Sequence, residues 1–183
     1  MDPTAAQVVD DTRRWLERAV IGLNLCPFAK SVHVKGQVHY VVSEATGWSA
    51  LLEDLEREIG DLLVADLARR ETTLLMAPRM LQDFYEFNGF LDEADRLLQR
   101  LELEGTIQLA NFHPDYQFAG TEPDDVTNLT NRAPYPTLHL LREDSIERAA
   151  QAIPEASDIY ETNKETLRRL GRDGFEAVLR GER

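Results

Sequence analysis

One stretch decides the predicted fold: TIQLANFHPDYQFAGTEPDDVTNLTNRAPYPTLHLLRE, residues 106–143. It begins with a strand pattern at 106–113 and ends with a second one at 137–141. Between them, residues 114–136 show neither helical nor strand periodicity. A structureless connection longer than roughly 12 to 15 residues is uncommon in a compact domain, and an ordered one is usually functional. We therefore expect the functional site on this loop.

Length and charge limit the classes of protein to which the chain can belong. Its 183 residues fit one α/β domain, with a short helical tail at about 172–183. Thirty-three acidic against twenty basic residues give a formal charge of -13, which repels nucleic acid and anionic membranes. The N-terminus lacks the basic and apolar regions of a signal peptide, so we expect a cytoplasmic protein with no nucleic-acid or membrane partner. The one cysteine excludes an internal disulfide.

Helix and strand patterns alternate along the rest of the chain. Asp2-Pro3 is typical of a helix start, and Gly22 is expected to end that helix. Apolar and β-branched runs predict strands at 38–43 and 72–77. Further helices are predicted at 48–63, from a cap at Asp83 to Gly105, from a cap at Asp144 over 145–153 to Pro154, at about 156–170, and from Phe175.

This order, α-β-α-β-α-β-long loop-β-α-α, predicts a mixed four-stranded sheet with helices packed on it. Helical crossovers make the first three strands parallel, so their carboxyl ends share one edge of the sheet. Ligands bind at that edge in open α/β sheets. If the fourth strand is antiparallel, the end of the loop returns to the same edge. The residues expected there are Glu44, Arg79, His113, Asp115, Asp124, Asp125 and Arg132.

His113 is the strongest candidate for catalysis, because a histidine at a strand end can act as a general acid or base near neutral pH. Asp124 or Asp125 would orient its ring. The simpler alternative is a histidine that only ties down the loop, with the two aspartates in a solvated turn after Pro123.

Cys26 is an optional nucleophile. A helical turn beginning at Pro27 would place its sulfur at a helix N-terminus and favour the thiolate. Pairing with His113 would activate it further. The apolar setting LCPFA favours a buried, structural cysteine instead.

Two arginines are candidates for holding a substrate anion. Arg79 follows a strand and Arg132 lies near the end of the loop, and a guanidinium group binds carboxylate or phosphate in a bidentate manner. Either could equally pair with one of the many acidic residues. Further candidates for substrate contacts are Asn131, Tyr116 and Glu44.

A divalent metal is the main alternative to acid-base chemistry. His113, Asp115, Asp124 and Asp125 offer a mixed histidine and carboxylate shell, although their spacing matches no strict template. His139 is out of phase with its apolar neighbours, which would place it on the opposite side of its strand. No nicotinamide, flavin or nucleotide fingerprint is present in the sequence.

Three segments carry a family resemblance: GLNLCPFAK, NFHPDYQFAGTEPDDVTNLTNRAPYPTLHLLREDSIERA and IYETNKETLRRLG. They resemble the bacterial domain-of-unknown-function family fourteen-fifteen from the first helix to Gly171, with small departures at Ala133 and Thr127-Asn128-Leu129. The resemblance implies a shared fold and site but no reaction. The candidate residues, with no redox-cofactor fingerprint and no second cysteine, lead us to expect a hydrolase or group transferase acting on a small anionic metabolite. The alternatives are a metal-dependent enzyme and a non-catalytic binding or scaffold protein.

Overall fold

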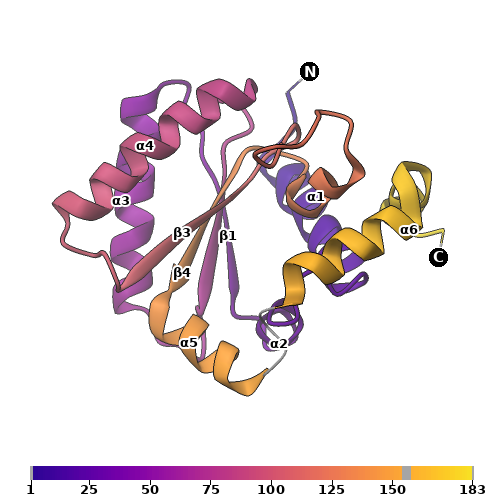
Figure 1. Cartoon of the computed structure of the whole chain (residues 1–183). Coiled ribbons are helices and arrows are strands. Elements are labelled where there is room, and N and C mark those ends of the chain that lie inside the picture. Colours follow the sequence, from indigo (N-terminus) through magenta and orange to yellow (C-terminus); the bar gives the residue numbers. More distant parts are fainter. Residues whose placement is uncertain (1, 154–157, 183) are drawn as a thin grey trace.

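The computed structural model describes residues 2–153 and 158–182 and has three layers (Figure 1). A four-stranded sheet lies in the middle, with strand order β1-β2-β4-β3. Helices α3 and α4 cover one face, and α1 and α6 lie on the other side (Figure 1). The strands are β1 Val38–Val42, β2 Thr72–Met76, β3 Ile107–Phe112 and β4 Thr137–Arg142. The predicted α/β fold with a mixed four-stranded sheet is confirmed.

The strand directions match the prediction. β1 and β2 are parallel, and β4 runs antiparallel to both β2 and β3. The carboxyl ends of β1, β2 and β3 therefore lie at one edge, and the loop 114–136 both leaves from and returns to this edge. Because β2 lies between β1 and β4 and has apolar clusters on both faces, all five of its residues are buried.

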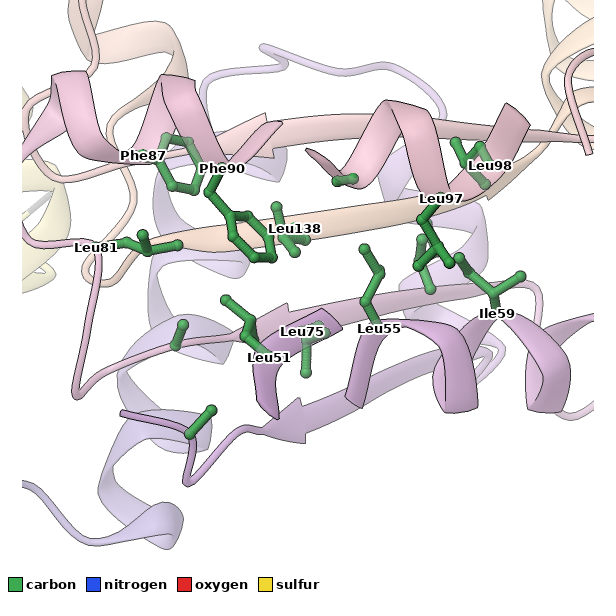
Figure 2. Close-up of a cluster of buried hydrophobic side chains, with 14 of the residues drawn as sticks. Leu51, Leu55, Ile59, Leu75, Leu81, Phe87, Phe90, Leu97, Leu98 and Leu138 are labelled. Atoms are coloured by element: carbon green, nitrogen blue, oxygen red, sulfur yellow. The ribbon is translucent and has the colours of Figure 1, made fainter. Parts of the chain in front are cut away.

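The larger core lies between the sheet and two helices that run in the same direction, α3 Trp48–Val64 and α4 Phe84–Arg100. Figure 2 shows its side chains meeting between α3, α4 and the strands, among them Leu51, Leu55, Leu75, Phe87, Phe90 and Leu138. Each fully buried side chain of this size contributes roughly 1.5 to 3 kcal/mol. The predicted cap of α4 is confirmed, because the Asp83 carboxylate accepts the N–H of Glu86.

The opposite face packs against segments from both ends of the chain. Helix α1, Ala5–Trp15, continues into a π-helix, η1, Leu16–Ile21, and a short helix α2, Ala29–Val34, follows. The long helix α6, Ile159–Arg180, lies beside them and the loop. The shared cluster contains Trp15, Leu16, Ala19, Val20, Leu129, Ala133, Leu167 and Phe175.

Several predicted helix boundaries are wrong. α1 is capped by Thr4 rather than Asp2, because Thr4 and Gln7 form a reciprocal capping box. α5, Glu143–Ala152, begins directly after β4 without the predicted Asp144 cap. The predicted end at Pro154 and start at Ala156 lie outside the described residues.

The predicted C-terminal tail is part of α6. This helix continues to Arg180 across a kink at Gly171, whose φ is 68° and ψ 175°. The side chains of Phe175 and Val178 are buried beyond the kink, so this segment packs on the domain. Within the described residues, no helix is long and apolar enough to cross a membrane.

Candidate functional site

His113 directly follows β3 and forms hydrogen bonds with both ends of the loop. Its ring is fully buried against Phe84 and Phe87, with ring centroids 5.3 and 5.0 Å away. Its Nδ1 accepts the N–H of Asp115 at 2.9 Å, so Nε2 carries the proton and donates to the Leu81 carbonyl at 2.8 Å. Burial lowers the pKa of His113, which keeps the ring neutral. Both nitrogens are thus engaged by the main chain.

The two loop aspartates do not bond to this ring. Asp125 caps the 3-10 helix η2, Val126–Asn131, where Oδ1 accepts the N–H and the hydroxyl of Thr127 at 2.9 and 2.7 Å. These bonds lower the pKa of Asp125. Asp124 offers its main-chain carbonyl to Arg172 Nη2 at 3.4 Å. The short helix, which the sequence pattern did not predict, gives the loop an ordered centre.

Aromatic side chains fix the loop on three helices. The Tyr116 ring lies 5.3 Å from Phe84 of α4, and the Phe118 ring lies 5.8 Å from Tyr160 of α6. The Tyr135 hydroxyl donates to Asp11 of α1 at 2.8 Å. Burial and this hydrogen bond raise the pKa of Tyr135 to about 12. The loop is therefore anchored at its start, middle and end.

Arg132, near the end of the loop, forms hydrogen bonds with residues nearer its start. Its Nε–H donates to the Tyr116 carbonyl at 3.1 Å and its Nη2 to the Pro123 carbonyl at 2.6 Å. Asn131, the preceding residue, accepts the main-chain N–H of His113 through its carbonyl at 3.2 Å. These bonds hold the Arg132 guanidinium group in place and leave its Nη1 without a hydrogen bond in the described part of the chain.

A pocket of about 470 Å³, here called the loop pocket, opens beside Arg132. It is lined by Trp15, Pro114, Asp115, Leu129, Arg132, Ala133, Pro134, Arg172, Phe175, Glu176 and Leu179. Its walls thus come from α1, the loop and the part of α6 beyond the Gly171 kink. A volume of roughly 300 to 1,000 Å³ is usual for small-molecule sites.

Two positive and two negative side chains meet at the loop pocket. Burial and the neighbouring charge of Arg172 lower the pKa of Arg132, while Asp115 acts in the opposite direction. The hydrogen bonds of both arginines go to main-chain carbonyls within residues 2–153 and 158–182. No carboxylate of the described residues forms an ion pair with either arginine, and Glu176 lies 3.8 Å from Arg180 instead.

Glu44 and Arg79 meet each other away from this pocket. Their side chains form an exposed ion pair at 2.7 Å, at the carboxyl ends of β1 and β2. Arg79 is thus paired with an acidic residue, which the sequence analysis gave as the alternative to binding a substrate anion. Neither side chain lines the loop pocket.

Cys26 is half-buried among apolar side chains around Trp15 and Leu129. Burial raises the pKa of the thiol, and the opposing effect of the Phe28 and Ala29 N–H groups is smaller. The thiol therefore stays protonated at neutral pH. Since both ring nitrogens of His113 are bonded elsewhere, the structure does not pair Cys26 with His113.

The proposed metal ligands do not converge. Within the described residues, no group of three or more His, Cys, Asp or Glu side chains is arranged to hold a metal ion. His139 packs against Phe112 on the face of the sheet opposite to His113. Thr72 Oγ1 donates to the Leu140 carbonyl, so it accepts the Nε2–H of His139 at 2.7 Å.

Five pocket residues that lie outside the loop were not predicted from the sequence: Trp15, Arg172, Phe175, Glu176 and Leu179. Trp15 has the helical spacing of a core residue, and Arg172 and Glu176 lie in the segment predicted to be a tail. One available signal was the spacing of Arg172 and Glu176, which places both on the same side of a helix. Their meeting with Arg132 depends on the fold.

The fold and the loop pocket define a single-domain α/β protein with a pocket formed by a long loop and helices from the two ends of the chain. The chain belongs to the family described as "Protein of unknown function (DUF1415)", whose model matches residues 7–177. The matched range contains all of the pocket residues except Leu179. Searches of curated proteins and of solved structures gave no match.

Proposed function

We propose that this protein binds a small anionic molecule in the loop pocket. The observation that carries the proposal is the pair Arg132 and Arg172, whose positive charges meet at a pocket in a chain of net charge -13. The main-chain bonds of Arg132 hold its guanidinium group before a ligand arrives, which reduces the entropy lost on binding. Charge-assisted hydrogen bonds to a carboxylate or phosphate would supply affinity.

In this proposal His113 is a positioning residue. Its Nδ1 fixes the main chain of Asp115, which lines the pocket, and its N–H fixes Asn131 beside Arg132. Turnover by hydrolysis or group transfer was predicted with His113 as the acid or base. Because that ring is buried and bonded to the main chain, the geometry favours binding over turnover. A cytoplasmic location is part of the same proposal.

The test measures anion binding by calorimetry for the wild type and three variants. The probes are acetate, hexanoate, succinate and inorganic phosphate. Removing a charged hydrogen-bond partner costs roughly 1.5 to 3 kcal/mol, so Arg172→Ala should weaken the best probe by about 10-fold to 100-fold. Arg132→Lys should also weaken it, because lysine cannot reproduce the planar contacts of arginine.

Arg79→Ala is the matched control. It removes an exposed arginine that is paired with Glu44 outside the pocket, so it should leave the affinity unchanged. The proposal fails if no probe binds the wild type, or if Arg79→Ala weakens binding as much as Arg172→Ala does.

A further inference from the structure

The charge balance of the loop pocket limits the charge of its ligand. Arg132 and Arg172 contribute two positive charges, and Asp115 and Glu176 contribute two negative ones to the same lining. A ligand with one negative charge can reach the arginines while meeting little net repulsion. An anion with two or more charges would be repelled by the two carboxylates as well as by the acidic surface of the whole chain.

The rest of the lining is apolar. Trp15, Leu129 and Phe175 are each at most 5% exposed, while Leu179 is half-buried and Pro134 is exposed. The volume of about 470 Å³ leaves space for a body attached to the charged head. An inorganic ion would leave the accessible parts of Pro134 and Leu179 in contact with water.

We propose that the ligand of the loop pocket is a monocarboxylate with an apolar body. This inference rests on the proposed function and adds the class of ligand. The carboxylate binds Nη1 of Arg132 and the guanidinium group of Arg172, and the body contacts Trp15, Phe175 and Leu179. Each methylene buried in such a site increases affinity by about threefold to fourfold.

The experiment compares acetate, butyrate, hexanoate and inorganic phosphate, titrated calorimetrically into the 183-residue protein at pH 7. We expect affinity to rise from acetate to hexanoate by at least 10-fold and phosphate to bind more weakly than hexanoate. Leu179→Ala removes part of the apolar wall but keeps the main-chain carbonyl that accepts from Arg18. It should reduce the gain with chain length and leave acetate binding unchanged.

The outcomes separate the two proposals. If all four probes bind through Arg172 but chain length has no effect, or phosphate binds most tightly, the monocarboxylate inference is wrong and anion binding stands. If Arg172→Ala leaves the affinity for hexanoate unchanged, the alkyl group of hexanoate binds to an apolar surface alone, and both proposals are wrong. Both proposals are supported if Leu179→Ala removes the gain in affinity with chain length and Arg172→Ala weakens the binding of all carboxylates.

Discussion

At the scale of single residues, the chemistry available to two histidines depends on burial and hydrogen bonds: His113 is fully buried and His139 is half-buried. His113 directly follows β3, His139 lies within the neighbouring strand β4, and the two rings face opposite sides of the sheet. Burial lowers both pKa values, that of His139 to about 4. The sequence correctly indicated that His139 faces away from His113. It could not show that the His113 ring is occupied by the main chain, because its partner Leu81 lies in a different segment.

The pKa of His139 makes a prediction about acid stability. Unfolding returns the pKa from about 4 to its ordinary value near 6.5, so the unfolded chain binds the proton first as the pH falls. The free energy of unfolding should therefore decrease between pH 6.5 and pH 4. His139→Gln keeps a donor for Thr72 but does not titrate in this range. Denaturant unfolding at several pH values should show a smaller loss on acidification in the variant.

His113 shifts in the same direction and titrates in both proteins, so the difference between wild type and variant isolates His139. If the two proteins lost stability in parallel from pH 7 to pH 4, His139 would not be the group responsible.

At the scale of elements, the kink in α6 decides whether the loop pocket has its second arginine. Gly171 has φ 68° and ψ 175°, a conformation almost restricted to glycine. We expect Gly171→Ala to lower the free energy of unfolding by roughly 1 to 3 kcal/mol. Arg172 follows directly, so the substitution should also weaken anion binding. Chemical denaturation and calorimetry measure the two effects.

Gly60→Ala is the matched control within another helix. A Cβ atom would meet nothing within 4 Å at either Gly60 or Gly171, so the two positions differ in backbone conformation rather than in space. Alanine in the middle of α3 should stabilise the protein by about 0.5 to 1 kcal/mol. Equal effects of both substitutions would show that the kink carries no conformational strain.

Elements with local signals were predictable, and contacts between distant segments were not. The apolar run of β2 and the Asp83 cap of α4 depend on a few adjacent residues, and both are confirmed. The cap of α1 was misplaced because Asp2 and Thr4 are both good N-cap residues, and the partner Gln7 selects Thr4. The loop pocket needs Trp15 and Arg172 to meet across the fold. Only the loop side of this pocket, including Arg132, was anticipated.

At the scale of the whole molecule, the sheet couples two cores. Leu75 of β2 belongs to the core under α3 and α4, while its neighbours Leu74 and Met76 belong to the cluster on the α1 side. Each core also has its own tryptophan. Trp48 packs against Phe90 on one side, and Trp15 packs against Phe112 on the other.

This arrangement predicts that both faces unfold in a single transition. Since alternate residues of β2 support the two cores, neither core can persist once the sheet is lost. In Trp48→Phe, Trp15 fluorescence and far-ultraviolet circular dichroism should give the same denaturation midpoint, and in Trp15→Phe the same holds for Trp48. Comparing the probes within each variant removes the effect of the substitution on stability. A Trp15 transition that precedes the loss of circular dichroism would instead show that the loop-pocket side opens independently. Ligand binding would then stabilise that side alone rather than the whole domain.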